Sequence, residues 1–205
     1  MDTLEEMHYF ASPVYTVKKL DFLETMKGVS DRYIQQSSRA GDPAEPLMTA
    51  NFMHEPEVAE FAQYVSQTAW NILLSQGYRM DELVTFFTEM WTQEHRYLST
   101  METHVHGMGA QINCFYFLDV PANSSKFVIH DPRPAKAMIN LLEKSPTAIS
   151  LASQQIVFTP EAGTMIFCNA WLPHSLTKNK SMDPVRFIHM NIAVAPAPET
   201  TVEVV

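Results

Sequence analysis

Two stretches of sequence decide the fold class of this 205-residue chain: Ala-Gln-Ile-Asn-Cys-Phe-Tyr-Phe-Leu at residues 110–118, and Val-Arg-Phe-Ile-His-Met-Asn-Ile-Ala-Val at residues 185–194. Both runs are rich in β-branched and aromatic residues, which is typical of strands. Similar short runs follow one another after residue 82 and are separated by Pro, Gly, Asn and Asp. This spacing predicts a β-sandwich or a β-barrel.

The second part of the chain is expected to contain eight strands and one small helix. The strands are expected at about 83–91, 97–103, 110–118, 126–130, 154–159, 164–168, 174–178 and 185–194. The helix is expected near 134–143. The number of strands fits a cupin-like jelly roll, also called a double-stranded β-helix.

The first part of the chain is expected to add a strand and two helices to this mostly β fold. Residues 8–20 hold β-branched and aromatic residues, which predicts a strand. Apolar residues recur every three or four positions in 21–35 and again in 55–77, which predicts two helices. We therefore expect a single domain over 1–205, with the N-terminal strand and helices in 8–80, the jelly-roll core in 83–194 and a mobile tail in 195–205.

The composition excludes several classes of protein. Lys and Arg total 14 against 23 Asp and Glu, and the net charge of -9 argues against nucleic acid, whose binding depends on basic surface. The two cysteines, Cys114 and Cys168, are too few for a disulfide framework. No apolar run approaches the roughly 18 to 20 residues needed to cross a bilayer, and the acidic N-terminus lacks the basic start of a secretory signal. We expect a soluble, cytoplasmic protein without nucleic-acid or membrane partners, and the sequence leaves a homodimer open.

Two histidines that are separated by one residue suggest a metal site. In Glu102-Thr-His104-Val-His106, the two side chains leave the same face of a strand and can converge on one ion. His174 follows at the edge of a later strand. In a chain with eight histidines a His-x-His pair arises easily by chance, so the pair alone is weak evidence for a metal.

A single arginine, Arg186, stands at the head of an otherwise apolar strand. Its guanidinium needs an anion or a carboxylate to accept its hydrogen bonds. That partner is either a bound ligand or one of the acidic side chains of the protein.

The order of these residues resembles the 2-oxoglutarate/iron(II) oxygenase family, which includes prolyl-hydroxylase-like proteins. The motifs that carry the resemblance are Phe10-Ala-Ser-Pro13-Val-Tyr15, Glu89-Met-Trp91, His104-Val-His106, Asn113-Cys-Phe-Tyr116, Asp131-Pro-Arg133, Trp171 to His174, and Arg186 to Asn191. They cover residues from about 8 to 193. Several motifs in the same order are much more specific than any one of them.

The resemblance implies a metal centre at His104, His106 and His174. The usual non-haem iron site has two histidines and one carboxylate, and His106 stands where the family normally supplies that carboxylate. The acidic alternatives for the third ligand are Glu102 and Asp131. The implied cofactors are Fe(II) and 2-oxoglutarate.

Other residues acquire expected roles from the same resemblance. Arg186 is expected to hold the far carboxylate of 2-oxoglutarate through its planar fork of donors. Asn113 and Phe117 replace a Ser and a Tyr of the family, so a cofactor contact is either lost or passed to the Asn113 amide. Arg133 and Asp131 either meet substrate or cosubstrate at the barrel mouth or pair with each other. His130 and His189 each lie an odd number of residues from a motif position and are expected to point away from the site.

The function expected from this resemblance is an iron(II)- and 2-oxoglutarate-dependent dioxygenase. Such an enzyme would use O₂ to hydroxylate a peptide or a small molecule and would decarboxylate 2-oxoglutarate. Two alternatives stay open. One is a cupin-like metal dioxygenase that has three histidine ligands and no 2-oxoglutarate, and the other is a non-enzymatic jelly-roll binding module.

Overall fold

The computed structural model describes residues 3–38, 42, 44–107, 109–145 and 147–198. The strands are β1 (Val14–Lys18), β2 (Leu47–Met48), β3 (Leu83–His95), β4 (Met101–His104), β5 (Ala110–Asp119), β6 (Phe127–His130), β7 (Gln155–Phe158), β8 (Thr164–Asn169), β9 (His174–Leu176) and β10 (Val185–Pro196). They form two antiparallel sheets. The larger sheet has the order β1-β8-β5-β10-β3-β2, and the smaller has the order β4-β9-β6-β7.

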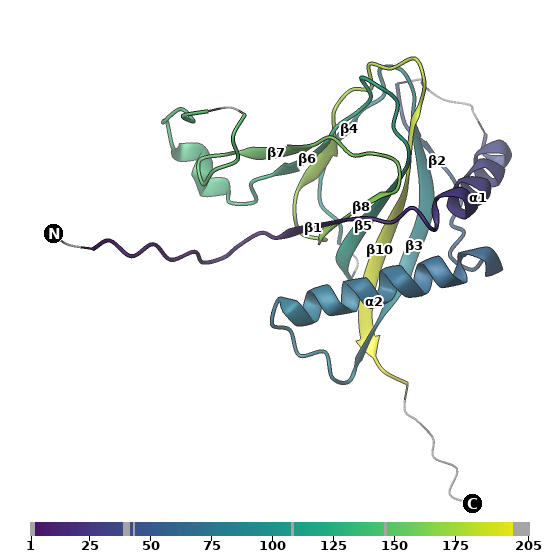
Figure 1. The fold of residues 1–205 in the computed structure, drawn as a ribbon, viewed down its shortest axis with the longest axis horizontal. Coiled ribbons are helices and arrows are strands. Elements are labelled where there is room, and N and C mark those ends of the chain that lie inside the picture. The colour runs from purple at the N-terminus through teal and green to yellow at the C-terminus, as the bar shows by residue number, and fades with distance from the viewer. Residues whose placement is uncertain (1–2, 39–41, 43, 108, 146, 199–205) are drawn as a thin grey trace, which may run out of the picture.

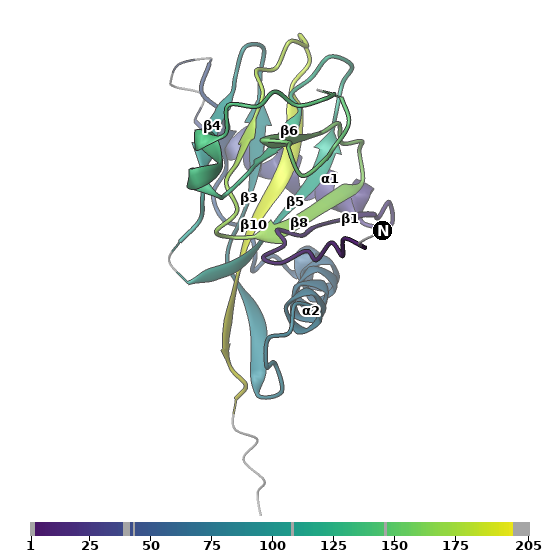
Figure 2. The same ribbon diagram turned by 90° about the vertical axis from the view of Figure 1, so that its left-hand side faces the viewer.

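Two helices, α1 (Leu23–Gln36) and α2 (Ala59–Ser75), cover one face of the larger sheet. Their buried residues, such as Met26 and Phe61, share one core with Tyr116 of β5 and Met190 of β10. In Figure 1 both helices lie on one side of the larger sheet, and β4, β6 and β7 lie on the other. Figure 2 shows the same layers after a quarter turn, with α1 behind the strands.

A second core fills the space between the two sheets. It joins Phe115 and Phe187 of the larger sheet to Phe127 and Leu176 of the smaller one. Side chains alternate along a strand, so successive residues of β5 and β10 belong to different cores. Both strands are therefore buried on both faces, and the inward face between the sheets carries the candidate site described below.

The fold agrees with the predicted mostly β class with N-terminal helices and with the double-stranded β-helix. The predicted small helix corresponds to a 3-10 helix, η2 (Pro134–Met138), and a second one, η1 (Pro56–Val58), precedes α2. β3 continues four residues beyond its predicted end, because the strand from Thr92 to His95 pairs with β10 and is buried. β10 continues to Pro196, so the part of the predicted mobile tail at 195 and 196 is strand. Residues 199–205 of that tail lie outside the described residues.

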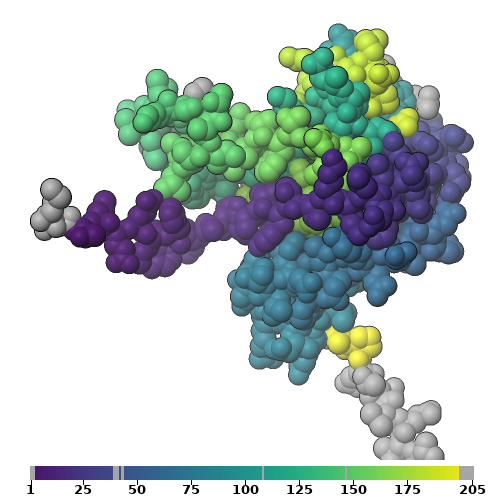
Figure 3. Space-filling model, in the orientation of Figure 1, coloured from purple at the N-terminus to yellow at the C-terminus, as the bar shows by residue number. Residues whose placement is uncertain are grey.

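Two parts of the chain project from the same side of the body (Figure 3). One is the extended N-terminal segment before β1, and the other is the region around η2. None of the helices in the described ranges is long and apolar enough to cross a membrane.

Candidate metal centre

Three histidines meet at the inner side of the smaller sheet. His104 ends β4 and pairs across the ladder with His174 of β9, so their rings lie side by side, 4.5 Å apart between centroids. His106 follows β4, where its backbone N–H donates to the carbonyl of Ala170 at 2.9 Å. One ligand atom from each of the three rings lies within 4.8 Å of the others. The structure thus brings together the three histidines that the motifs singled out.

Backbone hydrogen bonds orient two of these rings. Nδ1 of His104 lies 2.8 Å from the carbonyl oxygen of Glu102, and Nδ1 of His174 lies 3.0 Å from that of Leu172. A carbonyl oxygen only accepts, so Nδ1 carries the hydrogen and Nε2 keeps its lone pair. Nε2 of His106 and Nε2 of His174 are buried and have no hydrogen-bond partner. This is the state that a metal ion requires of histidine ligands.

Burial keeps His106 and His174 neutral at pH 7. It lowers the pKa of His174 to about 3 and the pKa of His106 to about 4, and neighbouring histidines add a smaller effect in the same direction. A neutral imidazole can donate its lone pair to a metal at once. A donor set of three imidazole nitrogens fits a divalent transition metal.

The two acidic alternatives for the third ligand do not join the three histidines. Asp131 is held by Arg133 and Lys136 at 2.7 and 2.9 Å, and the hydrogen bond from Arg133 is the main reason that the pKa of Asp131 lies well below its usual range. Glu102 is exposed, and its backbone carbonyl, not its carboxylate, faces His104. Within the described residues the candidate metal centre is therefore formed by histidines alone.

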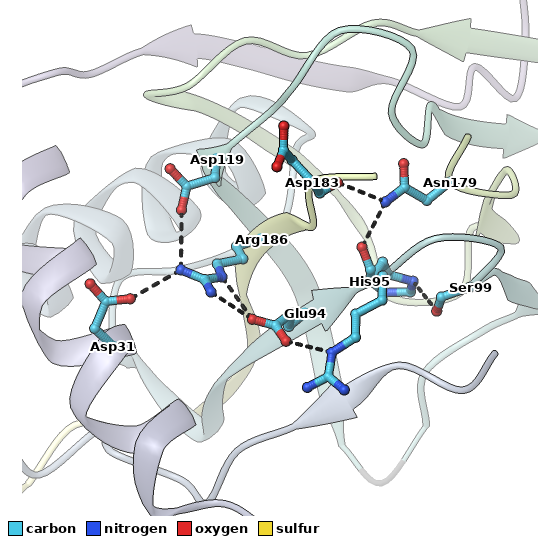
Figure 4. A network of polar contacts seen from close by, with 9 residues as sticks. Asp31, Glu94, His95, Ser99, Asp119, Asn179, Asp183 and Arg186 are labelled. Atoms are coloured by element: carbon cyan, nitrogen blue, oxygen red, sulfur yellow. Dashed lines mark hydrogen bonds and ion pairs between the residues drawn. The ribbon is translucent and has the colours of Figure 1, made fainter. Parts of the chain in front are cut away.

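Arg186 does not lie at the metal centre, contrary to the expected role as a cosubstrate clamp. Its side chain leaves β10 on the helix side, where Nη2 and Nε meet Glu94 Oε2 at 2.7 and 2.9 Å (Figure 4). Nη1 reaches Asp31 of α1 at 3.1 Å and Asp119 at 3.8 Å. The partners of the guanidinium are thus acidic side chains of the protein, the alternative that the sequence had left open for this arginine.

His189 takes the inward position next to the metal centre. It lies on the face of β10 opposite to Arg186, and its ring centroid is 4.6 Å from that of His106. The ring also stacks on Trp91 of β3 at 4.4 Å and contacts Phe115 at 4.7 Å. The sequence did predict that His189 and Arg186 face opposite ways, but it assigned the inward face to the wrong residue of the two.

The remaining predicted residues lie in three different places. Asn113 faces the space between the sheets and is fully buried. His130 lies on the outer face of the smaller sheet, where Nε2 contacts Ser175 Oγ at 2.8 Å, so it points away from the centre as predicted. Arg133 pairs with Asp131, and both residues line a pocket of about 260 Å³.

This pocket lies between the N-terminal segment and the smaller sheet. Its walls come from residues 8–12, 129–133, 150–151 and 153–156, together with Leu172. Two of the lining residues lie next to the metal centre, because Ile129 pairs with His174 on the neighbouring strand and the Leu172 carbonyl accepts the hydrogen bond from His174. The three histidines themselves are not among the residues that line the pocket.

Residues 89–188 match the model of a family described as "Putative 2OG-Fe(II) oxygenase". Similar solved structures include the α-ketoglutarate-dependent epimerase SnoN from nogalamycin biosynthesis, with a TM-score of 0.63, 13% identity and coverage of 91% of this chain and 79% of that chain. A prolyl-4-hydroxylase from Pseudomonas putida has a TM-score of 0.60 and 8% identity, with coverage of 89% and 93%. HygX from Streptomyces hygroscopicus, with nickel, 2-oxoglutarate and hygromycin B bound, has a TM-score of 0.58 and 10% identity, with coverage of 89% and 83%. No curated protein sequence matches the chain.

The comparisons confirm the resemblance that the motifs indicated. The solved structures share the fold at 8 to 13% identity. The family description contains both the enzyme class, an oxygenase, and the cofactor pair, 2-oxoglutarate and Fe(II). At the level of the family, the predicted class and cofactors are therefore confirmed, and the matched segment includes all three histidines of the centre.

Proposed function

We propose, with the match to the 2OG-Fe(II) oxygenases as the premise, that this chain is a dioxygenase that depends on iron(II) and 2-oxoglutarate. The observation that carries the proposal is the convergence of His104, His106 and His174, with two buried Nε2 atoms that no protein group satisfies. Buried polar atoms without partners are rare in proteins and call for a ligand or an ion. An iron(II) ion satisfies them.

The three histidines would hold the metal and leave other coordination positions open to ligands. The iron, together with 2-oxoglutarate and O₂, supplies the oxidation of a C–H bond, and 2-oxoglutarate is converted to succinate and CO₂. The protein contributes position: the carbonyls of Glu102 and Leu172 fix two imidazoles, and the aromatic residues between the sheets exclude water from the inner side.

The substrate in this proposal is a peptide or a small molecule that occupies the pocket beside His174. The pocket volume of about 260 Å³ suits a small molecule or one or two residues of a peptide. The lining Arg133 is 60% exposed, so its guanidinium can meet a polar substrate group while it pairs with Asp131. The similar structures include both a prolyl-4-hydroxylase and a protein with hygromycin B bound, so the fold is compatible with a peptide as well as with a small molecule.

The test is turnover of the cosubstrate. Purified protein that is given iron(II), ascorbate, O₂ and 2-oxoglutarate should form succinate, slowly without substrate and faster with a true substrate. His174→Ala should abolish succinate formation, whereas His54→Ala, which alters a histidine outside both the three-histidine cluster and the pocket, should not. Absence of both 2-oxoglutarate binding and succinate formation in the wild-type protein would refute the proposal.

The position of Arg186 favours one other candidate, a three-histidine metal dioxygenase without 2-oxoglutarate. In that case the metal-loaded protein would consume O₂ with a substrate alone, and 2-oxoglutarate would not change the rate. An Arg186→Ala variant does not separate the two candidates, because the side chain is bound to Glu94 and Asp31 and lies away from the centre. Oxygen uptake with and without 2-oxoglutarate separates them.

A further inference from the structure

Among the residues that the structure describes, most of the buried polar atoms without a partner lie around the candidate metal centre. In the described part of the chain, ten buried side-chain nitrogen and oxygen atoms have no hydrogen-bond partner, and six of them belong to five residues near the centre. These are Nε2 of His106, Nε2 of His174, Nδ1 of His189, Nε1 of Trp91 and both amide atoms of Asn113. A metal ion accounts for the first two atoms and leaves the other four without a partner.

The four remaining atoms come from neighbouring positions of one sheet. Trp91 of β3 lies directly across from His189 of β10, and Asn113 of β5 lies across from Asn191, two residues further along β10. Asn113 and His189 are both fully buried. A buried donor or acceptor without a partner is unfavourable, because the group loses its hydrogen bonds to water and gains none in the protein. A ligand that extends from the metal over β10 would satisfy them.

The charged side chain beside these atoms is an anion, Glu89, whose carboxylate accepts a hydrogen bond from the Asn191 amide. Among the described positions of β3, β5, β8 and β10 that face the smaller sheet, none is Lys or Arg. Arg186, the cation of β10, is on the opposite face and is already bound to Glu94 and Asp31. No cation of these strands is therefore placed to select a carboxylate at this end of a ligand.

The hydrogen bonds of Asn191 decide which atom of His189 is an acceptor. The Asn191 amide nitrogen donates to Glu89 Oε2 at 2.9 Å, so its oxygen faces Nε2 of His189 at 3.1 Å. That oxygen accepts, so Nε2 carries the hydrogen of the ring. In the neutral ring Nδ1 is then a bare acceptor, which requires a donor from the ligand.

We propose that the end of the 2-oxo acid far from the metal is recognised by the neutral groups Asn113, Trp91 and His189, and that the site accepts an uncharged carboxamide there as well as a carboxylate. A carboxamide oxygen can accept from Trp91 Nε1 and the Asn113 amide, and its NH₂ group can donate to His189 Nδ1. A carboxylate satisfies the two donors but offers no hydrogen to His189. The inference rests on the proposed function, because it concerns the cosubstrate of the same metal centre.

The experiment compares two ligands that differ only at the far end. N-oxalylglycine is an isostere of 2-oxoglutarate with NH in place of one CH₂ group, and N-oxalylglycinamide replaces its far carboxylate by a carboxamide. Calorimetric titration of the nickel-loaded protein should give dissociation constants within about threefold of each other, whereas a guanidinium clamp would favour the diacid by roughly 100-fold or more. Titration with 2-oxoglutarate is run in parallel.

Two variants of the neutral groups and one control complete the test. Asn113→Leu should lower the affinity for both ligands by about tenfold. Trp91→Phe removes the N–H group but keeps an aromatic ring against His189, and it should also lower the affinity for both ligands. The affinity for nickel should stay the same, which shows that the centre itself is intact. Arg186→Lys keeps the charge and loses the fork, and it should leave both affinities unchanged.

The outcomes separate the inference from the proposed function. If the wild-type protein binds nickel but neither 2-oxoglutarate nor the two oxalyl ligands, the proposed function fails and the inference fails with it. If 2-oxoglutarate and N-oxalylglycine bind, N-oxalylglycinamide does not, and Arg186→Lys loses affinity, the inference alone is overturned. Similar binding of both oxalyl ligands, with loss in Asn113→Leu and no loss in Arg186→Lys, supports it.

Discussion

At the scale of single residues, the buried histidines make the stability of this protein sensitive to acid. His95 lies in the inner face of β3, where it contacts Gln93 Oε1 through Nε2 and Ser99 Oγ through Nδ1, and burial lowers its pKa to about 4. In the unfolded chain its pKa returns to about 6.5. Between these two values the unfolded state binds the proton and the folded state does not, so stability falls as the pH falls from 6.5 to 4.

The His95→Gln variant should remove this dependence. The free energy of unfolding of the wild type relative to the variant should decrease by about 3 kcal/mol between pH 7 and pH 4, because a shift of one unit corresponds to about 1.4 kcal/mol. Urea titrations of both proteins with a chelator at several pH values measure the difference, in which the other histidines cancel. A difference that does not change with pH would contradict the prediction, because it would mean that His95 has the same pKa in the folded and the unfolded state.

Gly163 and Gly28 form a matched pair for testing backbone conformation. Gly163 has φ of +83°, and a Cβ atom there would lie 2.5 Å from Leu20 Cδ2. Gly163→Ala should therefore lower the free energy of unfolding by roughly 1 to 3 kcal/mol. Gly28 lies in α1 with no atom near its Cβ position, so Gly28→Ala should raise stability by about 0.5 to 1 kcal/mol. Thermal unfolding of both variants checks the opposite signs.

At the scale of elements, the ion pairs of Arg186 tie α1 to the sheet. The guanidinium joins Glu94 of β3 to Asp31 of α1, and Lys27 of α1 adds a bridge to Asp119 of β5 at 2.7 Å. Glu94 is almost completely buried, and the bonds from Arg96 and Arg186 lower its pKa against the opposing effect of burial. Removing one partner of a buried pair is costly, because the other charge stays behind without compensation.

We expect Arg186→Met to lower the free energy of unfolding by about 3 kcal/mol. Asp31→Asn is the control, because Asp31 is 54% exposed and its loss should cost less than about 1 kcal/mol. Urea unfolding measures both changes. Nickel binding by Arg186→Met should stay at the wild-type level. If the variant instead has normal stability but no longer binds 2-oxoglutarate, Arg186 binds the cosubstrate and the structural role is wrong.

At the scale of the whole molecule, the element types and the jelly-roll class could be predicted, but the orientation of β10 could not. Val185, Phe187 and Ile188, the residues of β10 next to Arg186, are all apolar and buried. β10 is covered by helices on one face and by the smaller sheet on the other. A strand that is buried on both faces has no polar side to mark its outer surface. The position of Arg186 is decided by Asp31 and Glu94, which lie 155 and 92 residues away along the chain. Long-range charge partners of this kind leave no local signal in the sequence.

The three-histidine cluster was easier to predict, because its geometry depends on local spacing. His104 and His106 are two residues apart beside one strand, and the strand that brings His174 to them pairs directly with β4. Trp91 was part of a predicted motif, but its contact with His189 depends on the register between β3 and β10. The three-histidine cluster therefore followed from the motif, and the residues packed around it did not.

Metal binding should stabilise the whole fold through this cluster. An ion that binds only the folded state stabilises it by about 2.7 kcal/mol when it is present at 100 times its dissociation constant. For a chain of this size that corresponds to a rise of roughly 5 to 10 °C in the unfolding temperature. Nickel or anaerobic iron(II) should give this rise in the wild type and in His130→Ala, whose side chain lies on the outer face of the smaller sheet. His174→Ala should show none, and a chelator should reverse the rise. An equal rise in His174→Ala would mean that the ion binds elsewhere, and the three histidines would then lose their assignment as the metal centre.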